Sequence, residues 1–289
     1  MTLEQLRIFV TVAETLSMTR AAERLHLTQP AVSAAVAALE RRHATHLFDR
    51  IGRRLELTEA GRLFLPEAQG VLARARDAGR VLDDLGGLLR GEVRIAASQT
   101  VATYWLPRRM AAFVAEVPNV RLKLLVGNSA QSAARVLSGE ADFGFVEATV
   151  EHDLLAWRVV GSDRIGLYAG HDHPLVGRAL TAEDLEAAAW VMREPGSGTR
   201  DHAAAGLAQS GVAVDRLRIV LEMPSNGAAL EAVEGGRLIT AVSELAAATR
   251  VAAGPIRPLQ WEMPPRDFTM LSHRARRPSR AAAAFRTIL

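Results

Sequence analysis

The sequence of 289 residues contains no cysteine, and this absence excludes several kinds of chemistry. Disulfide bonds, thiolate metal sites and thiol-based redox sensing all require that residue. No apolar run is long enough to span a bilayer, and acidic Glu4 stands where an export signal would begin with basic residues. We therefore expect a cytoplasmic protein, long enough for two domains of unequal size.

Lysine is nearly absent as well, because Lys123 is the only lysine among 35 basic residues. Arginine does not lose its proton in proteins, so the isoelectric point of about 10.1 reflects this preference, and the formal net charge is only +3. Contact with nucleic acid must therefore depend on local clusters of arginine, such as Arg41-Arg42 and Arg53-Arg54, rather than on the total charge.

Residues 17–43 have the pattern of two short helices that meet at a tight corner. Ser17 is suited to cap the first helix and Thr28 the second, and Pro30 stands in the first turn of the second helix, where a missing N–H costs little. Leu25-His26-Leu27 forms the corner. A helical hairpin inside a larger core would give the same pattern, because helical corners are common.

The second of these helices has two distinct faces. Its buried stripe is predicted to be Ala31, Val32, Ala35, Val36 and Leu39. Its opposite face is predicted to be Gln29, Ser33, Ala37 and Arg41. This second face is small near the start of the helix, which allows close approach to DNA base edges, and it has a cation further along that could meet phosphate.

A series of segments between Leu3 and Gly61 agrees in residue type and spacing with a known family. The segments are Leu6-Arg7-Ile8-Phe9-Val10, Ala21-Ala22, Leu25, Thr28-Gln29-Pro30-Ala31-Val32-Ser33, Leu39-Glu40, Leu47-Phe48-Asp49-Arg50 and Leu57-Thr58-Glu59-Ala60-Gly61. This stretch resembles the winged helix-turn-helix of LysR-type transcriptional regulators. The resemblance implies DNA contacts from Thr28, Gln29, Pro30, Ser33, Ala37, Arg41, Arg50, Arg53 and Arg54. Ala34 and Ala35 depart from the family, which often has polar residues there.

Two short apolar pieces between Leu47 and Leu57 flank Ile51-Gly52-Arg53-Arg54. Glycine supplies the turn, so this segment predicts a hairpin with arginines at its tip. We expect this wing to contact phosphate or the minor groove. For arginines without a neighbouring helix-turn-helix, a solvated charge cluster would be the better interpretation.

After Thr58, apolar residues recur at alternating steps of four and three, which predicts a long helix that ends near Leu89. The predicted seam is Phe64, Ala68, Val71, Ala75, Ala78, Leu82, Leu85 and Leu89. Such a seam is typical of a coiled coil, so we expect a homodimer, with a tetramer as a further possibility. Pro66 removes one backbone hydrogen bond and is expected to bend the helix. Two protomers would bind two half-sites related by a two-fold axis.

From Glu92 onward, segments with strand and helix character alternate, which predicts an α/β fold with mostly parallel sheets. This order resembles the two-lobed effector-binding domain of LysR-type regulators, which is similar to periplasmic solute-binding proteins. We expect a DNA-binding domain at 1–58, a linker helix at 59–90 and an effector-binding domain at 91–289. Lobe I would comprise about 91–160 and 266–289, and lobe II about 161–265.

Polar residues follow several of the predicted strands, where ligands gather in open α/β sheets. The candidate effector contacts are Ser98, Gln99, Thr100, Asn128, Ser129, Glu147, Ser197, Gly198, Thr199 and Arg200. Hydroxyls, close backbone N–H groups and the fork of Arg200 favour a small anion. In the alternative interpretation, Ser197 or Thr199 caps a helix and Arg200 is solvated. Glu147 could instead limit the size of the ligand or accept from a hydroxyl.

Two further features resemble a subgroup that regulates Calvin-cycle operons and sulfur or cysteine metabolism. They are Gly127-Asn128 together with Gly139–Glu147, and Arg193–Arg200. This resemblance implies sugar phosphates, reduced nicotinamide dinucleotide phosphate or sulfur oxyanions as effectors.

Motifs of enzymes are missing. No phosphate-binding lysine loop, dinucleotide fingerprint or nucleophile elbow occurs, and His171-Asp172-His173 lacks a third metal ligand nearby. We therefore expect no cofactor, no metal and no catalytic site.

The predicted protein is a regulator that binds promoter DNA, a small anion and RNA polymerase. One alternative is an α/β solute-binding or enzymatic protein with an incidental helical N-terminus. Another keeps DNA binding but has no ligand, so that the C-terminal domain is an assembly module.

Overall fold

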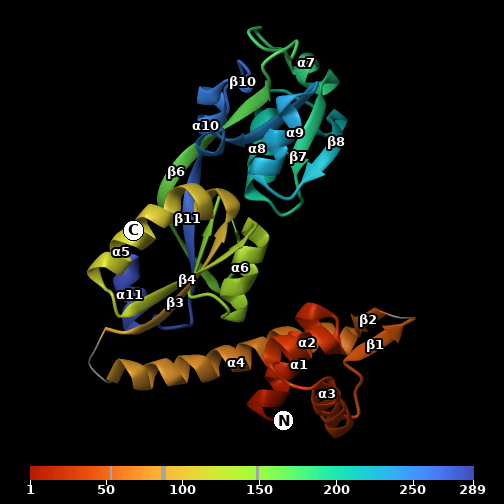
Figure 1. Cartoon of the computed structure of the whole chain (residues 1–289), viewed down its shortest axis with the longest axis vertical. Coiled ribbons are helices and arrows are strands. Elements are labelled where there is room, and N and C mark those ends of the chain that lie inside the picture. The colour runs from red at the N-terminus through yellow and green to blue at the C-terminus, as the bar shows by residue number, and fades with distance from the viewer. Residues whose placement is uncertain (53, 86–88, 148–149) are drawn as a thin grey trace. The chain divides into compact units, whose positions relative to one another are not determined.

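The computed structural model describes residues 1–52, 54–85, 89–147 and 150–289, and the chain forms two compact units, Met1–Gly87 and Leu88–Leu289 (Figure 1). Arg53 and the side chain of Leu85, both singled out in the sequence, lie outside the described part of the chain. Within that part, no helix combines the length and the apolar character needed to cross a membrane.

Three short helices open the first unit, and each begins at a side-chain cap. They are α1 (Leu3–Thr15), α2 (Met18–Leu25) and α3 (Gln29–His43). Ser17 Oγ accepts from the N–H of Arg20, and Thr28 Oγ1 accepts from the N–H of Ala31, so both predicted caps are confirmed. The corner after α2 is made by His26, whose φ of 56° reverses the chain.

The wing follows α3 as an antiparallel hairpin of β1 (Phe48–Ile51) and β2 (Arg54–Leu57). Gly52 lies in the turn with φ +64°, a conformation that glycine adopts without strain. Glu40, near the end of α3, accepts hydrogen bonds from the N–H groups of Leu47 and Phe48 and so fixes the approach to the wing.

Helix α4 (Glu59–Leu85) ends before Leu89, where the predicted linker helix ended, and its first turns belong to the core of the first unit. Phe64 packs inside the first unit with its ring centroid 5.0 Å from that of Phe9, and Ala68 is buried in the same core. Leu89 lies beyond the helix and packs against a core cluster of the second unit. Phe64, Ala68 and Leu89 therefore contribute to the cores of their own chain, and the coiled-coil seam stays a prediction.

The second unit contains one continuous sheet in the order β4-β3-β5-β11-β6-β9-β7-β8, with β10 paired to β6. Its strands are β3 (Gly91–Ser98), β4 (Val120–Gly127), β5 (Phe143–Val146), β6 (Leu155–Gly170), β7 (Ala189–Arg193), β8 (Arg218–Met223), β9 (Leu238–Ser243), β10 (Ile256–Pro258) and β11 (Pro265–His273). Its α-helices are α5 (Leu106–Glu116), α6 (Ser129–Ser138), α7 (Ala182–Ala187), α8 (Gly198–Gln209), α9 (Asn226–Glu234), α10 (Glu244–Ala253) and α11 (Arg280–Thr287).

Separate cores divide this unit into two lobes. In lobe I, α5 and α11 cover one face of the strands and α6 covers the other (Figure 1). In lobe II, α7 and α8 pack on one face of β7 and β9, and α9 and α10 pack on the opposite face. Each lobe is thus a sheet between two helical layers, the arrangement predicted from the alternation of strands and helices.

Strands β6 and β11 join the two lobes (Figure 1). β6 pairs with β11 as far as Arg164 and with β9 from Ile165, and both pairings are antiparallel. The parallel pairs expected from the sequence are those of β3 and β7 with their neighbours. The sequence did not predict residues 155–164 as a strand, nor α10 and α11. Many of those β6 residues are exposed, so the strand owes its conformation to pairing with β11 rather than to an apolar pattern.

Candidate functional site

The start of α3 presents the polar face that the sequence predicted. Gln29 is exposed, and its Nε2 donates to Ser33 Oγ at 2.8 Å, one helical turn further on. Ala34 is also exposed on this helix and was left out of the prediction. An exposed amide and a half-buried hydroxyl can exchange their mutual bond for bonds to a base edge, and a methyl group suits contact with thymine.

Buried side chains of α3 fix the helix to the first unit. Val32, Val36 and Leu39 are buried, as predicted. Ala31 is exposed and Ala35 is only half-buried, so the predicted stripe is too wide on the side of Ala31. The helix is therefore held by three large side chains, and its first turn, with Thr28 and Pro30 exposed, stands clear of the core.

Several arginines surround α3. Arg41 lies exposed in the last turn of α3, next to the exposed Arg42. Arg50 and Arg54 are exposed on the two strands of the wing. Ala37 is half-buried between the polar start of α3 and its arginines. Small or polar side chains at one end of a helix, with cations at its other end and on the neighbouring wing, are the arrangement of a DNA-reading element.

The second half of α4 exposes apolar side chains. Leu82 is 71% exposed, Val71 is 43% exposed and Val81 is 58% exposed. Ala78 is exposed as well, and Ala75 is half-buried. Exposed apolar residues at helical spacing are typical of a helix face that is available to a partner.

In the second unit, polar loops from the two lobes meet. After β3, Gln99 Oε1 accepts from the N–H of Asn226 at 3.1 Å, and Thr100 Oγ1 accepts from Asn226 Nδ2 at 3.0 Å. Asn226 begins α9 of lobe II. On the other side, Asn128 Nδ2 lies 3.5 Å from Glu194 Oε1 and from the carbonyl oxygen of Pro195. The predicted residues of both lobes are therefore brought together, with Asn226 as an addition.

Arg266, at the start of β11, lies among the predicted residues but was missed by the sequence analysis. Its guanidinium makes a bidentate ion pair with Asp163 of β6, and Nη2 lies 2.8 Å from Asp163 Oδ2. It also donates to Thr199 Oγ1 at 3.1 Å and lies 3.5 Å from Thr100 Oγ1. The side chains of Arg266 and Asp163 are only 1% and 2% exposed, so this pair is buried where the lobes join.

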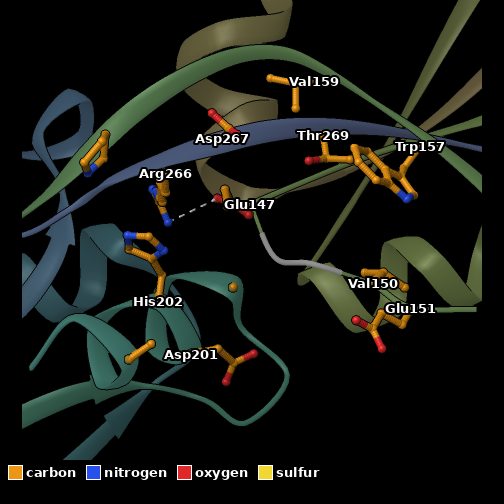
Figure 2. Close-up of a pocket in the computed structure, with 13 residues that line it drawn as sticks. Glu147, Val150, Glu151, Trp157, Val159, Asp201, His202, Arg266, Asp267 and Thr269 are labelled. Carbon is orange, nitrogen blue, oxygen red and sulfur yellow. Dashed lines mark ion pairs between the residues drawn. The ribbon is translucent and has the colours of Figure 1, made fainter. Parts of the chain in front are cut away.

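Glu147 lies beside Arg266, after the end of β5. Its Oε2 accepts from Ser129 Oγ at 3.2 Å, and its Oε1 lies 4.0 Å from Arg266 Nη1 (Figure 2). Its side chain is 2% exposed. Two carboxylates, those of Glu147 and Asp163, thus share one guanidinium in a buried region.

Arg200 does not offer the unpaired fork that the sequence predicted. Its Nη1 donates to the carbonyl oxygen of Arg193 at 2.8 Å and to Glu222 Oε2 at 2.7 Å. Arg193 was also missed as a site residue, and it is buried with its guanidinium bound to Glu194 and Asn226. The sequence offered one sign of this role, because Arg193 directly follows the apolar strand residues Trp190-Val191-Met192. Arg200 and Arg193 therefore each form an ion pair with a carboxylate of the protein, Glu222 and Glu194 respectively.

Two serines of the predicted site keep capacity for a ligand. Ser98 is 2% exposed, and its Oγ has no hydrogen-bond partner within the described residues. Ser197 is also buried and stands at the N-cap of α8 without a capping bond from its side chain. Gly198 and Thr199 are buried beside it. An unpartnered hydroxyl is costly in a folded protein unless something else satisfies it.

A pocket of about 630 Å³ opens beside these residues. Glu147 and Arg266 form its inner wall, and Trp157 and Val159 of β6 form another side (Figure 2). Asp201 and His202 of α8 face them across the space. Partial burial raises the pKa of the Asp201 carboxyl above its usual value, and the charge of Arg200 opposes this shift. Volume and lining suit a small organic molecule.

Possible metal ligands do not form a cluster in the described residues. No three His, Cys, Asp or Glu side chains converge there in a way that could hold a metal ion. His173, which the sequence analysis considered and rejected as a ligand, accepts through Nδ1 from the N–H of Leu175 at 3.2 Å. This bond is local and belongs to a turn.

Two family models match the chain. The model described as the LysR substrate binding domain matches residues 86–289, and the model described as the bacterial regulatory helix-turn-helix protein, lysR family, matches residues 3–62.

Proteins that are named as transcriptional regulators are similar to this chain over nearly its whole length. A RuBisCO operon transcriptional regulator of Allochromatium vinosum is 35% identical over 98% of this chain and 94% of its own. The uncharacterized HTH-type transcriptional regulator YeiE of Escherichia coli K12 is 32% identical over 98% of this chain and 95% of its own. Among solved structures, full-length CbnR in complex with its target DNA has a TM-score of 0.67 at 23% identity, covering 100% of this chain and 98% of its own. A full-length OxyR variant of Pseudomonas aeruginosa has a TM-score of 0.70 at 22% identity, and the match covers 100% of this chain and 94% of its own.

Proposed function

Since this chain belongs to the LysR family of bacterial transcriptional regulators, we propose that Gln29 and Ser33 read its promoter DNA and that the pocket beside Glu147 binds its effector. The family assignment makes it a DNA-binding regulator with an effector-binding domain rather than an enzyme. The alternative of a solute-binding or enzymatic protein with an incidental helical N-terminus is set aside for the same reason.

The observation that carries the DNA-reading role is the exposed pair Gln29–Ser33 in the first turns of α3. Gln29 and its bond to Ser33 are open to solvent, whereas Val32 and Val36 are buried, so the pair can enter a groove without disturbing the core. Gln29 can bond an adenine edge in a bidentate manner, and Ser33 can bond several bases. Arg50 and Arg54 of the wing would add contacts to phosphate that do not depend on sequence.

Dimerisation is proposed through the exposed second half of α4. Val71, Ala78 and Leu82 would pack against the same residues of a second protomer, and Ala75 would line the seam. Two recognition helices would then address two half-sites related by a two-fold axis. Pairing of dimers into tetramers, contact with RNA polymerase and a cytoplasmic location belong to this proposal as well.

The effector role rests on the interlobe residues. Ser98 has an unpartnered buried hydroxyl. Ser129, Glu147, Ser197 and Thr199 are also buried, and they lie at or next to the ends of strands and helices of the two lobes. A small molecule bound between lobes would favour one arrangement of them over another, and α4 would carry the change to the DNA-reading elements. The anionic effector expected from the sequence loses its main support, because Arg200 is paired with Glu222.

A footprint on the DNA upstream of the protein's own gene tests the DNA-reading role. Gln29→Ala should lose about 1–3 kcal/mol of discrimination between the footprinted site and random duplex. Arg54→Ala should weaken both complexes alike and reduce the dependence of affinity on salt. If Gln29→Ala discriminated as well as the wild type, α3 would not be the reading helix. Glu23→Ala on α2, an exposed residue outside the proposed face, is the matched control.

A further inference from the structure

The pocket between the lobes contains more carboxylates than cations. Glu147, Glu151, Asp201 and Asp267 all line it, and Arg266 is the one arginine among its lining residues. Arg266 is bound in two places to Asp163, so its positive charge is already matched. An anion that entered this pocket would meet an excess of negative charge at close range, which is unfavourable where water is partly excluded.

Glu147 has the feature that points to a ligand of opposite charge. Its side chain is almost fully buried, since only 2% is exposed, and it lines the pocket. Oε2 accepts from Ser129, but no donor among the described residues lies within hydrogen-bond distance of Oε1, and the nearest guanidinium nitrogen is 4.0 Å away. A carboxylate oxygen that lines a pocket and has no donor from the protein can accept from an N–H group of a bound molecule.

The wall of the pocket that β6 forms is apolar and aromatic. Trp157 is 65% exposed and Val159 is 46% exposed, and two-residue spacing places both on one face of β6 (Figure 2). A large aromatic side chain left open to solvent beside carboxylates suits a cation, because the face of an indole ring attracts positive charge. Val159 adds surface for the apolar part of the same molecule.

The size of the pocket and the spread of its acids exclude a bare metal ion as the simplest occupant. The volume of about 630 Å³ is that of a pocket for a small organic molecule. Within the described residues, no three acidic or histidine side chains come together as metal ligands. The ligand must therefore carry its own positive charge on a body large enough to reach from Glu147 to Trp157.

We infer that the effector is a small organic cation, an ammonium or guanidinium group on an apolar body, and that Glu147 selects it. This inference rests on the proposed role of the pocket as the effector site. The cationic nitrogen donates to Glu147 Oε1, the carboxylates of Asp201 and Asp267 add long-range attraction, and the apolar body lies on Trp157 and Val159.

Calorimetric titration of the full-length protein at low salt tests this inference with three probes of one shape. The probes are 2-phenylethylammonium, the neutral 2-phenylethanol and the anion 3-phenylpropionate. The cation should bind about tenfold tighter than the anion. Glu147→Gln should weaken the cation about tenfold and leave the neutral alcohol unchanged. Trp157→Leu should weaken the cation about threefold.

Controls separate the inference from the proposed function. Glu262→Gln, an exposed carboxylate that does not line the pocket, should bind the cation as the wild type does. Asp201→Asn provides a second variant, at a more accessible position, should Glu147→Gln fold poorly. Tighter binding of 3-phenylpropionate, or of inorganic phosphate, than of the cation would overturn the inference and keep the pocket as the effector site. Failure of all probes to bind would overturn both.

Discussion

The polar pair on α3 and the polar cluster between the lobes are in opposite environments. Gln29 and Ser33 bond to each other in contact with water, so either partner can change at little cost to folding. Arg266, Asp163 and Glu147 are buried, so each charge depends on the others for its stability. Substitutions on α3 should therefore change specificity and leave stability intact, whereas substitutions between the lobes should change both.

The largest effect is expected where this contrast is greatest. Arg266→Met leaves the carboxylates of Asp163 and Glu147 buried without a cation, so unfolding of the second unit should become easier by about 3–5 kcal/mol. Urea unfolding followed by circular dichroism measures the loss. Arg121→Met, whose side chain is 81% exposed, is the matched control and should change stability by less than about 0.5 kcal/mol. Equal stabilities of the two variants would show that the buried pair contributes nothing.

A smaller effect tests the exposed surface of α4. Leu82→Glu should leave the urea midpoint of each protomer unchanged, because this side chain is 71% exposed. It should weaken the dimer by at least about 1.4 kcal/mol, or tenfold, because a charge would enter the apolar seam. Sedimentation equilibrium measures the association. Leu154→Glu, at a loop position that is 47% exposed, should associate normally. An unchanged dimer in Leu82→Glu would remove this part of α4 from the interface.

The smallest effect compares two nearby histidines in lobe II. Burial lowers the pKa of His173 below its ordinary value of 6.5, whereas His171 is exposed. Between the ordinary and the lowered pKa the unfolded chain binds more protons than the folded chain, so stability is complete above pH 6.5 and falls as the pH drops through that window. Protonation of Nδ1 would also break its bond from Leu175, worth about 1 kcal/mol.

The measurement is urea unfolding at about pH 8 and at about pH 5.5. His173→Gln should lose less stability between these two conditions than the wild type, since it has no imidazole to protonate, and His171→Gln should behave as the wild type. A drop in His173→Gln as large as that of the wild type would assign the pH dependence to other groups.

The first unit could be predicted from local sequence because its signals are short in range. Caps at Ser17 and Thr28, and an apolar stripe through Val32, Val36 and Leu39, are each contained in a few turns of helix. The apolar repeat of α4 was harder to interpret, because it had two possible partners. Phe64 fits a heptad seam, but it packs on Phe9 of its own chain, and the repeat alone could not choose between them.

The site in the second unit was only partly predictable. The loops at Ser98, Asn128 and Ser197 follow strands, and that rule found them. Arg266 and Asp163 are separated by about a hundred residues in sequence, and neither stands in a recognisable motif. Their pairing depends on the alignment of β6 with β11, which no local pattern specifies.

By itself, the sequence determined the helix-turn-helix, the alternation of strands and helices, and the family. These follow from capping residues, hydrophobic periodicity and motif spacing, which are properties of neighbours along the chain. Only the tertiary structure decided which charged side chains form ion pairs with each other. Whether Arg200 or Arg266 faces a ligand depends on the carboxylates that folding brings beside it, and the Coulomb energy of a charge is set by distances in space rather than by positions in sequence.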